Sequence, residues 1–183
     1  MQARGADMRR LLAPFLACLV AAGAAAETDP LAPWAGTWRG RCELIPPYQG
    51  SSGLETLLTI APGADGSYTW RLVYEASGSV PRQVRDYELV PVDAVKGHYV
   101  LDEKNGLKLD TFVVGRAIYS YFMISGNRIP SHDELLSEDE MLMSLPMFEE
   151  APVRNTCLTG KPSVCTDSFR LKTAQSCRLR RQR

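Results

Sequence analysis

Apolar and polar residues alternate in a series of short segments that covers most of the chain. In Gly36–Leu44, the residues Trp38, Cys42 and Leu44 share one face with Gly40, while charged side chains occupy the other face. A period of two is typical of a strand with one buried face. No helical period exceeds one or two turns, so the pattern predicts an all-β fold of about eight or nine strands. The further segments with strand character are 54–61, 68–74, 84–92, 98–103, 107–114, 117–124, 128–129, 141–145 and 168–173.

Turn signals between these segments predict how they connect. Asp65-Gly66 and Asn105-Gly106 favour tight hairpins, and Asn-Gly in particular suits a type I′ turn. Consecutive hairpins make a meander with two open edges, which closure into a barrel hides most completely. A two-sheet sandwich is the alternative, but it usually needs long crossover connections, and the long connections here lie near the chain ends. We expect a single antiparallel up-and-down β-barrel.

Two segments in the second half of the chain lack clear alternation. Ser131–Glu140 is acidic and is expected to form a loop or a short helical turn. Glu149–Asp167 contains prolines, a glycine and two cysteines, and it is expected to form a long loop closed by a disulfide. These expectations place the last strand at Ser168–Thr173.

The first 26 residues have the features of a secretory signal peptide. Three arginines precede the apolar run 11–20, and a series of alanines ends at Ala26. The apolar run is shorter than the roughly 20 residues that span a membrane. We expect cleavage after Ala26, which leaves residues 27–183 as one exported domain, periplasmic or secreted, with no membrane span after processing. A retained N-terminal anchor and lipidation of Cys18 are the alternatives.

Four cysteines remain after this processing, and an even number in an exported chain favours two disulfides. Three connectivities are open to them. We expect Cys157 to pair with Cys165, because a glycine and a proline help the intervening segment to turn back, and Cys42 then pairs with Cys177. The chain has no Cys-x-x-Cys motif and two histidines, so we expect no metal site.

Charge and motif content argue against nucleic-acid binding and against catalysis. The full chain carries 21 basic and 21 acidic residues, and removal of residues 1–26 leaves a net charge of −2, which favours neither nucleic acid nor a charged surface. Ser131, His132 and Asp133 are the residue types of a hydrolytic triad, but adjacent residues do not converge as a triad does. No Gly-x-Ser-x-Gly motif is present. We therefore expect a protein that is not an enzyme and has no cofactor.

The start of the exported chain carries a short motif with a known structural role. Gly36-Thr37-Trp38 follows the segment 30–34, and in this it resembles the lipocalin-like, or calycin, superfamily of β-barrels. In that superfamily, the tryptophan plugs the closed end of the barrel, often against an arginine from the last strand. The resemblance implies a structural role for Trp38, with Arg170 or Arg178 as the arginine.

Aromatic residues on the predicted strands are the candidate ligand contacts. Trp70 and Tyr74 share one face of segment 68–74, and Tyr87, Tyr119 and Tyr121 lie on later strands. Tyrosines in a cavity supply apolar area together with hydroxyl groups that orient a ligand. Alternation does not show which face is inside, so these rings can instead fill the core or pair across strands.

The sequence leaves two functions open. The first is a barrel that binds a small apolar molecule in its interior. The second is a periplasmic barrel with a protein partner, such as an inhibitor of a secreted protease or lysozyme. An aromatic-lined cavity favours the first function, and a filled core with a protruding ordered segment, such as 149–167, favours the second.

Overall fold

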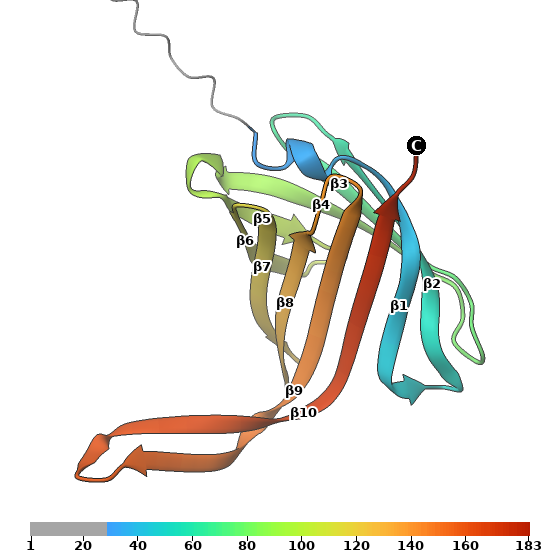
Figure 1. The fold of residues 1–183 in the computed structure, drawn as a ribbon. Coiled ribbons are helices and arrows are strands. Elements are labelled where there is room, and N and C mark those ends of the chain that lie inside the picture. Colours follow the sequence, from blue (N-terminus) through green and yellow to red (C-terminus); the bar gives the residue numbers. More distant parts are fainter. Residues whose placement is uncertain (1–28) are drawn as a thin grey trace, which may run out of the picture.

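Ten antiparallel strands close into a barrel in the computed structural model, which describes residues 29–183 (Figure 1). The expected signal peptide, its cleavage site after Ala26 and Cys18 lie outside the described residues. None of the helices in the described part of the chain is long and apolar enough to cross a membrane. The elements in chain order are η1 (Ala32–Trp34), β1 (Gly36–Tyr48), β2 (Ser51–Pro62), β3 (Tyr68–Tyr74), β4 (Gln83–Asp93), η2 (Ala94–Lys96), β5 (His98–Asp102), β6 (Lys108–Val114), β7 (Ala117–Ile124), β8 (Asn127–Leu135), β9 (Glu140–Leu158) and β10 (Lys161–Arg181).

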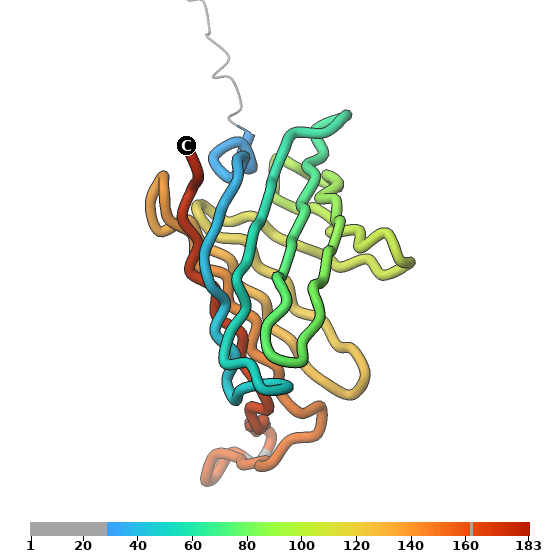
Figure 2. The backbone as a smooth tube through the Cα atoms, turned by 90° about the vertical axis from the view of Figure 1, so that its right-hand side faces the viewer, coloured from blue at the N-terminus to red at the C-terminus, as the bar shows by residue number. Residues whose placement is uncertain are grey.

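The strands follow one another around the barrel in chain order, and hydrogen bonds between β1 and β10 close it (Figure 1, Figure 2). The closing pair is antiparallel, like the pairs between consecutive strands. An up-and-down barrel closes in this way only with an even number of strands, because an odd number brings the first and last strands together in the same direction. The expected all-β antiparallel barrel is confirmed, with ten strands in place of about eight or nine.

The difference in strand number comes from β8, of which alternation indicated only residues 128–129, and the strands that follow it are longer than expected. Residues 131–135 of segment 131–140, which was expected to be a loop or a short helical turn, belong to β8, and segment 149–167 extends β9 and β10. These two strands continue beyond the barrel as a two-stranded ribbon, which we define as residues 149–170 (Figure 1). Most of the described ribbon side chains are exposed, so no buried face imposes alternation on them. The loop predictions are therefore wrong for 131–135 and for 149–167, whereas residues 136–139 do connect two strands, and the expected Cys157–Cys165 disulfide is present in the ribbon.

The hairpin predicted around Asn105-Gly106 joins β5 to β6, but its turn differs from the expected type. Positive φ values occur at Lys104 (57°) and Gly106 (101°), whereas a type I′ turn on Asn105-Gly106 requires a positive φ at Asn105 as well. The backbone amide of Glu103 donates to the carbonyl oxygen of Leu107 (3.0 Å), and the Asn105 side chain accepts from the amide of Leu107 (2.9 Å). The connection is thus a longer loop braced by the asparagine side chain.

The seam between β1 and β10 joins the first and last strands of the barrel. Cys42 lies opposite Cys177 in the register, and their sulfur atoms form the second expected disulfide. Near this bond, the two backbones approach closely at Gly40. A Cβ atom at Gly40 would lie 2.1 Å from the carbonyl oxygen of Arg178, so a larger residue there requires β10 to move.

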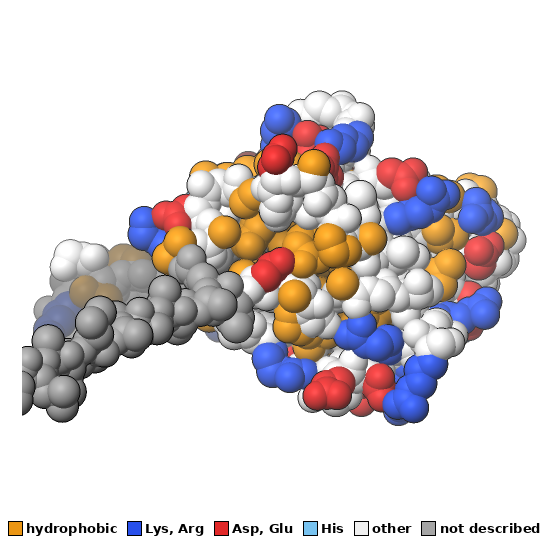
Figure 3. All heavy atoms as spheres, turned by 90° about the horizontal axis from the view of Figure 1, so that it is seen from above, with side chains coloured by type: hydrophobic (Ala, Val, Ile, Leu, Met, Phe, Trp, Pro, Cys, Tyr) orange, Lys and Arg blue, Asp and Glu red, His pale blue; other side chains and the backbone are white. Residues whose placement is uncertain are grey.

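The first turn of the described chain closes one end of the barrel, where apolar side chains gather inside a rim of charged ones (Figure 3). Trp38 is fully buried, and its indole Nε1 donates to the carbonyl oxygen of Trp34 in η1 (2.9 Å). The Arg181 guanidinium lies 4.1 Å from the centre of the Trp38 ring, which is a cation–π contact, and it donates to the carbonyl oxygens of Pro33 and Ala35. Trp38 therefore lies buried at this end of the barrel, between η1 and Arg181.

The arginine over Trp38 differs from the two that were expected. Trp38 pairs with Arg181 in the register of β1 and β10. Arg178 is exposed and forms an ion pair on the outer face, and Arg170 forms an exposed ion pair in the ribbon. The error follows from ending the last strand at Thr173, because β10 continues to Arg181 and brings that residue to the closed end.

Candidate ligand-binding cavity

A cavity of about 130 Å³ lies in the barrel interior. One water molecule needs roughly 10–15 Å³ on the same measure, so the cavity has room for several water molecules or one small organic molecule. Strands β3 to β10 line it, because every second residue of each strand points inward. The apolar lining residues are Trp70, Leu72, Leu89, Leu101, Leu109, Ile118, Phe122, Met143 and Leu145.

The tryptophan in the cavity wall connects the cavity with the closed end of the barrel. Trp70 on β3 is 4% exposed, and its ring centre lies 6.2 Å from that of Trp34 in η1. Both rings are thus held in the apolar core cluster that also contains Trp38. A ligand in the cavity would contact Trp70 directly, which makes tryptophan fluorescence a reporter of occupancy.

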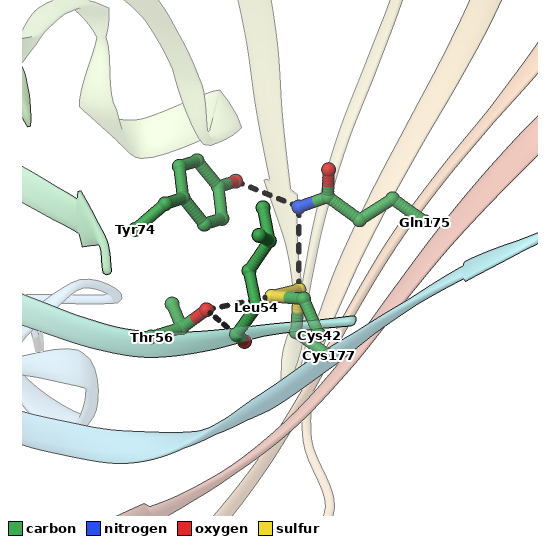
Figure 4. The surroundings of a disulfide bond; sticks show 6 residues. All are labelled: Cys42, Leu54, Thr56, Tyr74, Gln175 and Cys177. Atoms are coloured by element: carbon green, nitrogen blue, oxygen red, sulfur yellow. Dashed lines mark hydrogen bonds between the residues drawn. A yellow bond between two sulfur atoms is a disulfide. The ribbon is translucent and has the colours of Figure 1, made fainter. Parts of the chain in front are cut away.

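A hydrogen bond between β3 and β10 crosses the interior beside the seam disulfide (Figure 4). The Gln175 Nε2 atom donates to the Tyr74 hydroxyl oxygen (2.7 Å), and it also lies 3.4 Å from the Cys177 sulfur. Burial raises the pKa of Tyr74, so this hydroxyl stays protonated at neutral pH. Its own hydrogen has no acceptor among the described residues, which leaves a donor available to a ligand.

Arginine and tyrosine side chains stand where the cavity meets solvent. Arg85 is exposed yet contributes to the lining, and its guanidinium donates to the Tyr87 hydroxyl (3.2 Å) and to Gln83 Oε1 (3.3 Å). Its Cζ atom lies 5.7 Å from the centre of the Tyr74 ring. Glu103 lines the same region and interacts electrostatically with Arg85. The charge of Arg85 is therefore partly balanced by protein groups.

Asp133 on β8 is the cavity residue with the most unusual surroundings. Its partners across β7 and β9 are Ile118 and Met143, which are both apolar. No hydrogen bond or ion pair joins its carboxylate to another residue within 29–183. Burial alone raises the pKa of Asp133 to about 7. The pKa is raised because Asp133 lacks the hydrogen-bond donors and the cation that a buried carboxylate charge requires.

The structure divides the predicted ligand contacts into two groups. Trp70, Tyr74 and Tyr87 line the cavity as expected. Tyr119 and Tyr121 do not, because they lie on the outer face of β7 with exposed fractions of 45% and 61%. Their neighbours 118, 120 and 122 point inward instead. The register of β7, which the sequence pattern did not orient, is the physical reason for this correction.

Sequence reasoning missed the polar residues of the cavity. Asp133 fell in a segment expected to be a loop, although Ile129, Ser131, Asp133 and Leu135 do alternate, and they occupy the inner face of β8. An acidic residue at an inward position and further acidic residues at 134 and 138–140 concealed this pattern. His132 points outward, where its ring stacks on Tyr119 at 4.8 Å between centres. His132 therefore points away from Ser131 and Asp133, which share the inner face of the strand, and the three side chains do not converge.

Comparison with known proteins identifies a similar fold and no family. No family model matches the sequence, and no curated protein matches it. The chain is similar to a solved structure from Nostoc punctiforme, a protein of unknown function from the DUF3598 family, with a TM-score of 0.52 and 9% sequence identity over 82% of this chain. The match covers 48% of that protein, so this chain spans about half its length. At this identity the likeness supports the fold alone.

Proposed function

We propose that this chain is an exported, non-enzymatic barrel protein that binds a small, mostly apolar molecule in its interior. The observation that carries the proposal is the cavity itself, whose wall is apolar over most of its area and also carries charged, hydroxyl and amide side chains. Ligand sites in proteins usually have this composition, in which the apolar wall supplies affinity and the polar groups supply orientation. Tyr74, Arg85 and Asp133 are the polar groups that can orient a ligand here.

Export and a lipocalin-like character are part of the same proposal. The two disulfides are typical of proteins from oxidising compartments, which supports export. The Gly-x-Trp strand, the plug formed by Trp38 and the arginine stacked on it support a lipocalin-like barrel. A barrel of eight strands is just wide enough inside for side chains or for one small ligand, and the diameter grows with the number of strands, of which this barrel has ten.

Filling the cavity tests this function. Ser131 lines the cavity, and Ser131→Phe adds a ring to its interior. We expect 1-hexanol to bind the native protein saturably, with a change in tryptophan fluorescence, and to bind Ser131→Phe at least about tenfold more weakly, or about 1.4 kcal/mol. Ser52→Phe places the same side chain on the exposed face of β2 and serves as the control. Equal affinity in all three proteins, or no saturable binding, would contradict the proposal.

A second candidate function, attachment to a protein partner, has one observation in its favour. The ribbon extends from the barrel, is cross-linked by Cys157–Cys165 and exposes apolar side chains (Figure 1). Val153, Leu158 and Val164 are each at least 50% exposed. The two functions use different parts of the molecule. Replacing the ribbon by a tight turn should therefore abolish binding of the protein partner, while hexanol binding persists. Loss of hexanol binding would show that the ribbon and the barrel interior depend on each other.

A further inference from the structure

Three charged side chains line the cavity, and they differ in how well their charge is balanced. Arg85 hydrogen-bonds to Tyr87 and Gln83 and interacts with Glu103, so a cation and an anion face each other near solvent. Asp133 has neither a hydrogen-bond donor nor a cation beside it among the described residues. The interior therefore contains one acidic group whose charge is not compensated.

We propose that the ligand of this cavity is a small amphiphilic amine, whose protonated nitrogen pairs with the Asp133 carboxylate while its apolar body packs against the apolar wall. This inference rests on the proposed function, since it names the chemical class that the same cavity takes. An ammonium group supplies both the opposite charge and the N–H donors that the carboxylate lacks. The resulting pair is charge-assisted and lies in apolar surroundings, where electrostatic attraction is stronger than in water.

The neighbours of Asp133 favour a cation over other head groups. An anion would meet an uncompensated like charge, and its natural partner Arg85 already has polar partners. A neutral alcohol can donate one hydrogen bond to the carboxylate but leaves its charge unbalanced. An apolar body then has Trp70, Ile118 and Met143 within the same cavity. The combination of one uncompensated carboxylate with these apolar side chains is thus complementary to a small amine.

A pH experiment on the cavity has to take the charge of its other titratable groups into account. Burial raises the pKa values of Tyr74 and Tyr87, which keeps both phenols neutral at physiological pH. For Arg85, burial acts to lower the pKa, but the hydrogen bond to Tyr87 and nearby charges outweigh it, so the group stays protonated. Glu103 lies near Arg85, and Glu103→Gln tests its contribution directly. Ile118, Met143 and Gln175 on the neighbouring strands carry no charge.

The experiment compares three probes with the same chain length, namely hexylamine, 1-hexanol and hexanoate, by calorimetric titration at pH 8. We expect hexylamine to bind most tightly and hexanoate most weakly. In Asp133→Asn, hexylamine should lose about tenfold to a hundredfold in affinity, the range for hydrogen bonds to charged groups, while hexanol affinity changes little. Glu134→Gln is the matched control, because Glu134 follows Asp133 on the same strand and lies on the opposite face.

The pH dependence of hexylamine binding supplies a second readout. Protonation of Asp133 competes with the amine, so affinity should fall about a hundredfold between pH 8 and pH 5 if this group titrates near 7. In Asp133→Asn the affinity should not vary over this range. If Asp133→Asn does not fold, the carboxyl carbon resonance of Asp133 is followed by NMR in the native protein instead. Bound hexylamine should then lower the pH at which this resonance titrates.

The possible outcomes separate this inference from the function on which it rests. If hexanol binds and Ser131→Phe weakens it, but hexylamine gains nothing from Asp133, the cavity binds apolar molecules and the amine inference is wrong. Tighter binding of hexanoate than of hexylamine would also overturn it. If none of the three probes binds saturably, the proposed function itself fails.

Discussion

At the residue scale, Asp133 lowers the stability of the empty protein at neutral pH. An aspartate in an unfolded chain has a pKa of about 3.9, and burial in the barrel raises the pKa of Asp133 to about 7. The folded protein therefore holds this proton more tightly than the unfolded chain. The protonated Asp133 carboxyl therefore contributes fully to the stability of the folded protein below about pH 4. This contribution is lost as the pH rises through about 7. The loss is at most about 4 kcal/mol, since each pKa unit corresponds to about 1.4 kcal/mol.

Asp133→Asn should therefore stabilise the protein in a pH-dependent way. We expect its free energy of unfolding to exceed that of the native protein by about 1–3 kcal/mol at pH 8 and to differ little at pH 4. Urea unfolding at the two pH values measures this difference. Glu134→Gln changes a carboxylate on the outer face of the same strand and should show no such pH dependence. A difference between Asp133→Asn and native protein that is the same at both pH values would refute this account.

At the scale of elements, alternation was a reliable guide only where a strand has one buried face. The bounds of β3 and β7 could be predicted to the residue, because β3 in particular alternates around Trp70 and Leu72. The direction in which β7 faces could not be predicted, since both of its faces carry large side chains, and Tyr119 and Tyr121 were misplaced as a result. The ribbon has little buried surface, so backbone hydrogen bonds and a disulfide define it without a hydrophobic pattern.

The ribbon should behave as a unit that depends on its own disulfide. Cys157 and Cys165 are separated by 8 residues and lie outside the barrel. Replacing both by Ala should increase amide hydrogen exchange within residues 149–170, because the ribbon has few other buried contacts. Exchange in β3 to β7 should stay unchanged. Faster exchange throughout the barrel would show that the ribbon and the barrel unfold together.

At the scale of the whole molecule, one covalent bond joins the strands that close the barrel. Cys42 and Cys177 are 135 residues apart and form the β1–β10 seam together with the backbone ladder. A link across so much chain restricts the unfolded state strongly. The sequence was sufficient to predict this pairing, since neighbouring first and last strands follow from closure of a meander. The cavity size could not be predicted, because it depends on which of the inward side chains fill the space.

Removing the seam disulfide should cost much of the stability of the protein. For Cys42→Ala/Cys177→Ala we expect a loss of about 5 kcal/mol in the free energy of unfolding, as the loop-entropy account gives for a loop of this length. For Cys157→Ala/Cys165→Ala the loss should be about 2.5 kcal/mol, since the loop is short. Denaturant unfolding of the two double variants gives the comparison. Equal losses would argue against the closure of the barrel by β1 and β10.

A crystal structure of the protein grown with 1-hexanol tests the central claim most directly, because that claim is that the barrel interior receives a small, mostly apolar molecule. We expect the alcohol inside the barrel, with its chain against Trp70 and Met143 and its hydroxyl within hydrogen-bond distance of Asp133 or Tyr74. A barrel interior filled by side chains, or hexanol bound at the ribbon alone, would contradict the account.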